Sequence, residues 1–237
     1  MKEDSIPLFF GIIAFMTAIA LAILPYFIRR HKDRELLKSV TELDRGTPSE
    51  RKLILTLLKH DIPASTIFHD LYLEKRPGKY AQIDAVIATR VGIIVFEVKD
   101  YSGWLFGKGH QPYWTQILAY GKERYRFYNP VWQNNGHIDA LKKKLRANPD
   151  VPFYSVIVFY GNCILKNVSC IPPGTFLAYP DDVLQIVEHL LQCNPNAHYD
   201  SKTEVLRVLK EAVNNGQDPK VQFQHILNVS NTTNPSL

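Results

Sequence analysis

Two neighbouring apolar runs, at residues 81–89 and 92–100, most constrain what this chain can fold into. Both runs are rich in valine and isoleucine, the β-branched residues that favour strands. Only Arg90 and Val91 separate them, so we expect two adjacent antiparallel strands joined by a tight turn. The chain is therefore predicted to contain a central β-hairpin, around which the rest of a sheet can assemble.

Charged residues interrupt both runs. Asp84 lies in the first run among isoleucine, alanine and valine, and Glu97 and Lys99 end the second run after four apolar residues. Side chains alternate across a strand, so Glu97 and Lys99 share a face, about 7 Å apart. Charges are costly inside a core unless they are paired or bind a ligand. These three residues are therefore the first candidates for a functional site.

A hairpin symmetric about its two-residue turn sets Asp84 opposite Glu97. A slip of one residue would instead move Asp84 to the other face of the sheet. Two carboxylates side by side repel each other unless a proton or a metal ion intervenes. The expected register therefore favours a cation site between the two strands.

Mg²⁺ is typically held by one or two carboxylates together with water and a substrate phosphate. We therefore expect Asp84, Glu97 and the main-chain carbonyl of Val98 to hold Mg²⁺ or Mn²⁺. Lys99 would then position the attacking water and offset the charge that develops on a phosphate. The alternative is that Glu97 and Lys99 only pair with each other at a solvated strand end.

The remaining elements predict a mixed sheet flanked by helices. A helix should begin at Pro48, because Thr47 is a typical N-cap and Glu50 completes a capping box. A second helix should begin after Asn129 by the same logic and run to about residue 146. Further strands are expected at 65–73, within 104–128, at 152–161 and at 174–180, and further helices at 181–192 and 202–213. This order of elements is typical of an α/β or α+β fold.

The N-terminal region is strongly apolar. Residues 6–28 contain no charge, and a helix needs about 20 such residues to cross the hydrocarbon core of a bilayer. A secretory signal would begin with a basic segment, whereas the residues before this stretch are net acidic. Basic residues follow at positions 29, 30, 32 and 34. By the positive-inside rule we expect a single-pass membrane protein, in contact with the bilayer through this stretch, with its N-terminus outside and its globular domain in the cytoplasm.

We therefore expect an anchor at 1–30, a juxtamembrane linker at 31–46, a globular domain at 47–213 and a loose polar tail at 214–237. With 46% hydrophobic residues, the chain can bury a proper core. The formal net charge of +5 favours anionic partners, either nucleic acid or a membrane surface. The three cysteines have no zinc-type spacing and do not indicate a disulfide framework.

Several short motifs follow one another in order: QID at 82–84, GIIVFEVK at 92–99, SG at 102–103, Trp114, and NPVWQNNGH at 129–137. Together they resemble the nuclease-related domain (NERD) family, which is similar in turn to the PD-(D/E)xK nucleases. The resemblance covers roughly residues 46–160. It implies a restriction-endonuclease-like α/β core in which Asp84, Glu97 and Lys99 are the motif residues.

The resemblance also implies a glutamate in the helix before the strands, matched by Glu50, and a glutamine in the helix after them, matched by Gln133. For Glu50, the capping box is an alternative explanation. Two positions depart from the family pattern. The usual Gly-Glu start is spread from Gly46 to Glu50, and Asp100 stands where the family has asparagine, although it should point to the opposite face from Lys99.

Other candidates lie on the helix that follows Asn129. His137 comes one turn after Gln133 on the same face, and is either a site residue or an ordinary structural histidine. Lys142, Lys143 and Lys144 either contact phosphates or solvate the C-terminus of that helix. We predict a membrane-anchored, metal-dependent nuclease. The alternative is a catalytically silent binding or scaffold module with the same fold, tethered to the membrane.

Overall fold

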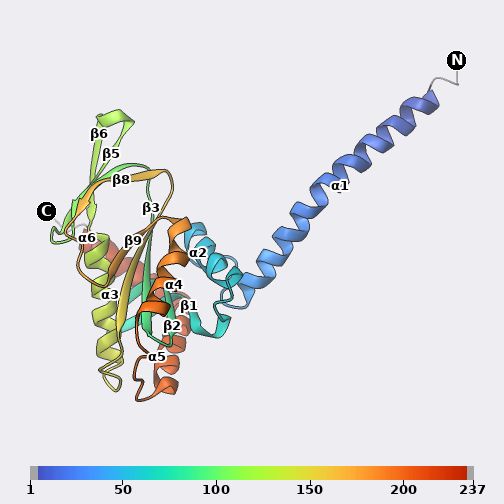
Figure 1. Cartoon of the computed structure of the whole chain (residues 1–237). Helices are drawn as coiled ribbons and strands as arrows, with labels where there is room; N and C mark the ends of the chain where they lie inside the picture. Colours follow the sequence, from blue (N-terminus) through green and yellow to red (C-terminus); the bar gives the residue numbers. More distant parts are fainter. Residues whose placement is uncertain (1–4, 234–237) are drawn as a thin grey trace.

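A five-stranded mixed sheet forms the centre of the computed structural model, which describes residues 5–233 and the side chains of residues 15–228 (Figure 1). The strand order is β1-β2-β3-β7-β9. These strands are β1 (Ile67–Arg76), β2 (Lys79–Thr89), β3 (Gly92–Asp100), β7 (Phe153–Tyr160) and β9 (Thr175–Ala178). β1, β2 and β3 pair antiparallel, whereas β7 and β9 run parallel to β3. The predicted mixed sheet is confirmed.

The β2–β3 hairpin has the register expected from its two-residue turn. Pairing extends from the turn to Ala85 and Phe96 and ends there. Asp84 and Glu97 occupy the next position in the same register, just beyond the last backbone pair. The hairpin therefore delivers both carboxylates to one place in the fold.

A second sheet lies beside the first and has the strand order β6-β5-β4-β8. Its strands are β4 (Gly103–Lys108), β5 (Tyr113–Leu118), β6 (Glu123–Tyr128) and β8 (Cys163–Ser169). β8 falls in a stretch for which the sequence predicted no strand. Trp114 of β5 stacks on Phe159 of β7, with ring centroids 6.2 Å apart and planes 9° apart. This contact joins the two sheets, while the β5–β6 hairpin projects from the fold (Figure 1).

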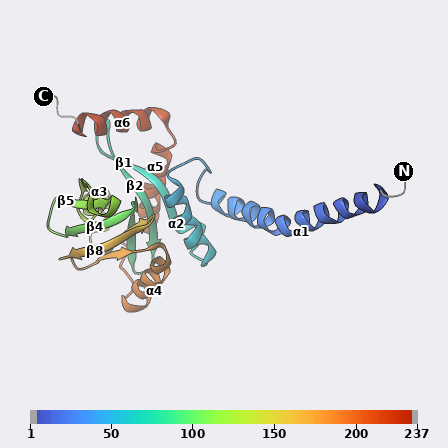
Figure 2. The ribbon, with the colours of Figure 1, turned by 90° about the horizontal axis from the view of Figure 1, so that it is seen from above.

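Helices cover both faces of the central sheet (Figure 2). They are α2 (Pro48–Lys59) and α4 (Val183–Cys193) on one face, and α3 (Pro130–Lys144) and α5 (Lys202–Asn215) on the other. Phe96 of β3 is buried with the apolar residues of α2 and α4, and its neighbour Val95 with those of α3 and α5. Because side chains alternate along β3, Glu97 and Lys99 lie on the α3 face.

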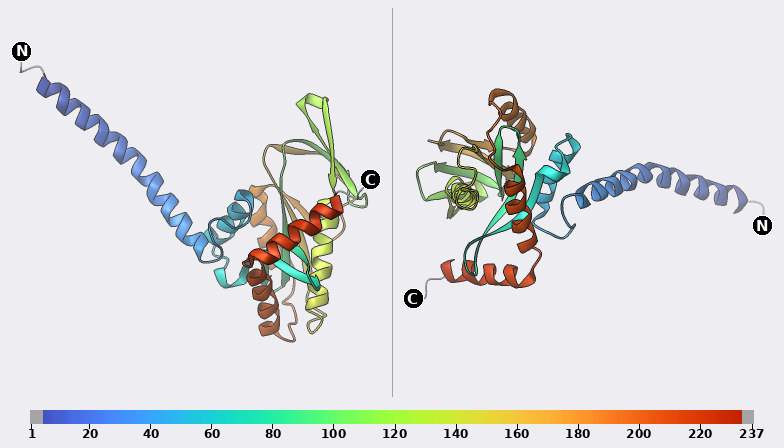
Figure 3. Two further views of the ribbon diagram at one scale, coloured as in Figure 1. Left: turned by 180° about the vertical axis from the view of Figure 1, so that it is seen from behind. Right: turned by 90° about the horizontal axis from the view of Figure 1, so that it is seen from below.

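Helix α1 (Ser5–Lys38) projects away from the rest of the molecule (Figures 1 and 3). Its C-terminal end contacts the globular part, where Leu37 is buried in the core. There Asp33 also lies 2.7 Å from Lys59 of α2. The first part of the predicted linker at 31–46 is therefore a continuation of α1.

We expected residues 6–28, which lie within α1, to form a transmembrane anchor. Among the side chains that the structure describes, no helix is both long and apolar enough to cross a membrane. These side chains therefore do not support the predicted anchor. Residues 6–14 of the expected span lie outside them.

The C-terminal region contains a helix, α6 (Pro219–Thr233), where the sequence predicted a loose tail from Asn214. α6 lies across the β1–β2 hairpin (Figures 2 and 3). Nδ1 of His225 lies 3.2 Å from the carbonyl oxygen of Tyr80, and Asn228 donates to the carbonyl of Gly78 at 3.0 Å. Where the sequence predicted a loose polar tail, two polar side chains thus contact the backbone of the hairpin.

Candidate active site

The end of β3 carries a buried ion pair. The side chains of Glu97 and Lys99 are 2% and 18% exposed, and Oε1 of Glu97 lies 2.7 Å from Nζ of Lys99. The two residues share the α3 face, as the alternation of the strand predicted. Their pairing is thus a buried contact within the fold and not the solvated strand end that was the alternative.

Helix α3 adds two polar side chains to this pair. Nζ of Lys99 donates to Oε1 of Gln133 at 3.0 Å. One helical turn later, Nε2 of His137 lies 3.2 Å from Oε2 of Glu97. The start of α3 is set by Asn129, whose side chain accepts from the main-chain N–H of Val131 at 2.9 Å. The predicted helix start and the spacing of four therefore place both residues against the ion pair.

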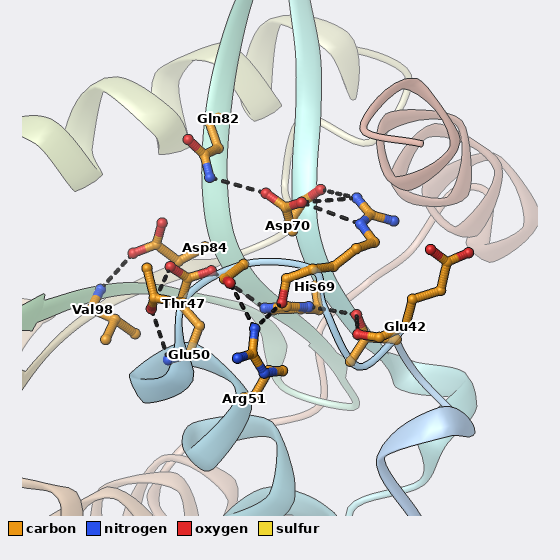
Figure 4. Close-up of polar contacts among 12 residues, drawn as sticks. Glu42, Thr47, Glu50, Arg51, His69, Asp70, Gln82, Asp84 and Val98 are labelled. Atoms are coloured by element: carbon orange, nitrogen blue, oxygen red, sulfur yellow. Dashed lines mark hydrogen bonds and ion pairs between the residues drawn. The ribbon is translucent and has the colours of Figure 1, made fainter. Parts of the chain in front are cut away.

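Asp84 approaches from the neighbouring strand, and its Oδ2 accepts a 2.7 Å hydrogen bond from the main-chain N–H of Val98 (Figure 4). The pKa of Asp84 lies well above its usual range. Burial is the largest cause, and the negative charges of Glu97 and Glu50 add to it, while the bond from Val98 opposes it. Three carboxylates from two strands and a helix therefore act on one another electrostatically.

In contrast to Asp84, both members of the Glu97–Lys99 ion pair are stabilised in their ionised forms. Burial alone raises the pKa of Glu97, but the contact with His137 and the charge of Lys99 outweigh it, so the pKa lies below its usual range. Burial likewise lowers the pKa of Lys99, but the charge and hydrogen bond of Glu97 outweigh it, so the pKa lies above its usual range. Glu97 and Lys99 are therefore both ionised at neutral pH, next to an Asp84 that resists ionisation.

Glu50 lies in the first turn of α2 and is buried. Its main-chain N–H donates to Oγ1 of Thr47 at 3.2 Å, and that hydroxyl donates to Oε1 of Glu50 at 2.8 Å. The other oxygen, Oε2, lies 3.3 Å from Nε2 of His69 on β1 (Figure 4). Glu50 therefore contacts the N-cap residue Thr47 through one oxygen, while its negative charge acts on Asp84.

A second buried pair, which was not predicted from the sequence, lies beside the site. Arg45 donates to Oδ2 of Asp70 through Nε at 3.2 Å and Nη2 at 3.1 Å. Gln82, two residues before Asp84 on β2, donates to Oδ1 of Asp70 at 2.9 Å (Figure 4). An available signal was that Asp70, like Asp84, is an acid within an apolar strand. A cavity of about 390 Å³, lined partly by Glu50, Asp70 and Gln82, opens here.

The other sequence candidates lie at the surface or on the opposite face. Lys142, Lys143 and Lys144 are exposed at the C-terminal end of α3. Nζ of Lys142 lies 5.6 Å from the ring centre of Phe153, on a different side of the helix from the cavity that the next two lysines line. Asp100 accepts from Ser49 of α2 at 2.5 Å, so it faces away from Lys99 as expected.

The described side chains do not include three His, Cys, Asp or Glu residues placed to hold a metal ion. Two features nevertheless fit a divalent cation. Oε2 of Glu50 and Oε2 of Glu97 are buried and accept no hydrogen bond, although an imidazole nitrogen lies near each. The repulsion that raises the pKa of Asp84 would also be relieved by a cation. Because Mg²⁺ needs only one or two carboxylates, Asp84, Glu97 and the carbonyl of Val98 fit it.

Comparisons with known proteins point to one family. The family model described as "Nuclease-related domain" (NERD) matches residues 45–160, nearly the range of 46–160 expected from the motifs. An uncharacterized protein of Bacillus anthracis is 27% identical over 144 residues, which are 61% of this chain. The matched region spans 66% of that protein's length. No solved structure matches the chain.

Proposed function

Because residues 45–160 form a nuclease-related domain, we propose that this protein hydrolyses phosphodiester bonds of nucleic acid with Mg²⁺ or Mn²⁺. The observation that carries the proposal is the arrangement of Asp84, Glu97 and Lys99. Two adjacent strands bring these charges together in the hairpin register that pairs Ala85 with Phe96. The helix that follows supplies their remaining partners.

Lys99 is the residue that acts on the phosphate group. Its pKa is raised, so it carries a full positive charge at neutral pH and can stabilise the charge that develops in the transition state. Gln133 accepts from Nζ of Lys99 and fixes its direction. His137 contacts Glu97 and orients that carboxylate in turn. Both α3 residues are therefore positioning residues in this proposal.

Asp84, Glu97 and the carbonyl of Val98 would hold the cation, with Glu50 close by. When bound, such a cation supplies positive charge and Lewis acidity to the phosphate group. Without a cation, the raised pKa of Asp84 favours its protonated form. A bound cation would offset the negative charges of Glu97 and Glu50, so Asp84 would then lose its proton. Cation binding and ionisation of Asp84 are therefore coupled.

The test uses the full-length protein, purified in mild detergent, with labelled DNA and RNA oligonucleotides. Cleavage should require Mg²⁺ or Mn²⁺, stop with EDTA, and fall at least about 100-fold in Lys99→Ala, as when one charge-stabilising group is removed. If the wild type and Lys99→Ala show the same background cleavage, the proposal is wrong.

A second candidate function is a binding module that does not cut. The observation in its favour is that both oxygens of Glu97 already lie near a partner, Lys99 at 2.7 Å and His137 at 3.2 Å. In this case oligonucleotide binding persists in Asp84→Ala and Lys99→Ala, and purified wild type shows no metal-dependent cleavage. Loss of binding in both variants would exclude this candidate.

We also propose that residues 6–28 anchor the protein in a membrane with the globular domain in the cytoplasm. The support is the uncharged stretch, the basic residues after it, and the exposed apolar side chains of Phe15, Met16, Leu21 and Leu24 on α1. The protein should then remain in the membrane fraction through an alkaline wash and dissolve in detergent. A variant lacking residues 1–30 should move to the soluble fraction; release of the full-length protein by the wash would contradict the anchor.

A further inference from the structure

A large cavity lies between the β1–β2 hairpin and the C-terminal half of α3. Its volume is about 930 Å³. Cations dominate its lining: Lys75, Arg76 and Lys79 from the hairpin, and Lys143, Lys144 and Arg146 from α3 and the residues after it. Against these six, only two carboxylates line it, those of Glu74 and Asp139, which leaves a surplus of four positive charges. We refer to this cavity as the basic groove.

The six cations of the basic groove are uncompensated. All six are exposed, and none forms an ion pair or a side-chain hydrogen bond with another described residue. By contrast, buried Arg45 and Lys99 are each paired with a carboxylate. A concave surface lined by free cations attracts polyanions. The lining therefore favours a ligand with several regularly spaced negative charges.

The basic groove and the candidate active site lie along one face of α3. Along α3, site and groove residues alternate on one stripe: Gln133, Gly136, His137, Ala140, Lys143 and Lys144. Residues three and four apart share a helix face, so the stripe leads from the site into the groove. On the other wall, Lys79 comes five residues before Asp84 on β2, about 17 Å along the strand.

The floor beside α3 is open. A Cβ atom added to Gly136 would meet no atom within 4 Å. From Gly136 to Arg146 the groove extends about 15 Å along the helix direction at 1.5 Å per residue. The phosphates of one strand are spaced by about 3.4 Å when projected on the duplex axis and lie further apart along the strand itself, so this length accommodates at most about four of them. A short run of phosphates therefore fits both the length of the groove and its surplus of positive charge.

We propose that the basic groove binds the sugar–phosphate backbone of a nucleic-acid strand and leads that strand to Asp84, Glu97 and Lys99. The leading role rests on the proposed nuclease function, whereas the binding does not. Contacts to phosphates make this binding independent of base sequence and strongly dependent on salt.

One wall of the basic groove, α3, lies far from α1. In Figures 1, 2 and 3, α1 leaves the fold on the side opposite α3. If α1 inserts in a bilayer, the α3 wall of the basic groove therefore lies on the side of the fold away from that bilayer. This placement favours nucleic acid over an anionic membrane surface as the ligand.

The test measures binding of fluorescein-labelled oligonucleotides, single-stranded and duplex, to the full-length protein in EDTA. The double variant Lys143→Gln/Lys144→Gln should lose roughly tenfold in affinity at low salt, and its plot of log affinity against log salt should be shallower by about 1 to 2. The matched control Lys52→Gln/Lys210→Gln removes two exposed lysines from α2 and α5, and should bind as the wild type does. Circular dichroism confirms that the variants fold.

A charge-neutral variant tests the geometry. Gly136→Leu fills the open floor of the basic groove and should also weaken binding, with no change of net charge. Wild-type affinity in both Lys143→Gln/Lys144→Gln and Gly136→Leu would overturn the proposal, as would an equal loss in the lysine control. Absence of oligonucleotide binding in the wild type, or binding only to phosphatidylserine vesicles, would overturn it as well.

The binding experiment tests the groove independently of the nuclease proposal, because it is done in EDTA, which prevents metal-dependent cleavage. If the groove variants lose binding while the wild type never cleaves, the groove stands and the nuclease proposal fails. If the wild type cleaves while the groove variants bind and cleave normally, the nuclease proposal stands and the groove fails.

Discussion

The main-chain N–H of Val98 donates a 2.7 Å hydrogen bond to the carboxylate of Asp84 at the point where pairing of β2 and β3 stops. The carboxylate thereby takes the place of the next backbone partner. This bond holds Asp84 in a buried position that raises its pKa, and the charges of Glu97 and Glu50 raise that pKa further. The position of Asp84 is therefore unfavourable for its own ionised form, which is a common property of functional sites.

We expect Asp84→Asn to abolish cleavage and to stabilise the fold. The amide oxygen can still accept the hydrogen bond from Val98, while the charge that Glu97 and Glu50 oppose is removed. The free energy of unfolding at pH 8 should rise by about 1 kcal/mol, a usual size for relief of an unfavourable functional group. Thermal and chemical denaturation of the full-length protein measure this change. Asp84→Ala is the control, since it leaves the Val98 N–H unpaired and should lower stability.

The stabilisation by Asp84→Asn should depend on pH. Because the pKa of Asp84 is raised in the folded protein, the folded state holds this proton more tightly than the unfolded chain does. The stabilising contribution of the protonated form is complete below the ordinary carboxyl pKa and is lost as pH rises through the raised pKa. The gain over wild type should thus be small near about pH 4 and grow towards pH 8. A gain that is equal at both pH values would contradict the raised pKa.

Glu97→Gln should destabilise the protein by about 3 kcal/mol, because it leaves the charge of Lys99 buried without its partner. The double variant Glu97→Gln/Lys99→Met should lose less stability than the single one, since no unpaired charge remains. Glu35→Gln is a matched control: its pair with Lys38 has the same 2.7 Å length but is half exposed, so its loss should change the stability far less than the loss of the buried pair does. Equal losses for Glu35→Gln and Glu97→Gln would contradict the buried pair.

Gln133→Ala should lower kcat about tenfold and leave KM within about twofold, if the nuclease proposal holds. The reason is that Gln133 accepts from Nζ of Lys99 and contributes to its direction, without a substrate contact of its own. The adjacent Asn135, on another side of α3, supplies the control variant Asn135→Ala. Single-turnover cleavage with saturating oligonucleotide separates the two parameters. A change confined to KM would show that Gln133 acts in binding instead.

The core of the site was predictable because its contacts are local or periodic. A two-residue turn leaves little freedom in register, so the position of Asp84 opposite Glu97 followed from the sequence. The shared helix face of Gln133 and His137 followed from a spacing of four on a capped helix, whereas the contact of His137 with Glu97 did not, because the sequence left His137 as either a site residue or a structural histidine. The hairpin register and the shared helix face are each determined by a short stretch of the chain.

The features that sequence reasoning missed depend on long-range contacts. Arg45 reaches Asp70 across 25 residues, and Asp70 has a φ of +52°, which no strand pattern predicts. The side chains of α6 bind the backbone of the β1–β2 hairpin some 145 residues earlier in the chain. Polar residues of this kind look like solvent-exposed positions, because sequence alone does not show which backbone groups remain unpaired.

Gly46 should be among the most sensitive positions near the site. Its φ is +62°, and a Cβ atom there would collide with Oε2 of Glu50 and lie 2.6 Å from Nε2 of His69. Gly46→Ala therefore combines an unfavourable backbone conformation with a forced shift of Glu50. Gly174 is the matched control, since its φ is +76° but an added Cβ would meet no atom within 4 Å.

Gly174→Ala should lower the free energy of unfolding by about 1–2 kcal/mol, because alanine is unfavourable at a positive φ. Gly46→Ala should cost roughly 1–3 kcal/mol more, the usual cost of overpacking, because Glu50 and His69 are buried and have little room to move. Urea denaturation gives both values, provided that the two variants keep the wild-type m-value. Gly46→Ala should also reduce cleavage, because it displaces Glu50 beside Asp84, whereas Gly174→Ala should cleave as the wild type does. Equal losses of stability in the two variants would show that Glu50 and His69 can move aside at no cost. Only the positive φ of Gly46 would then require glycine.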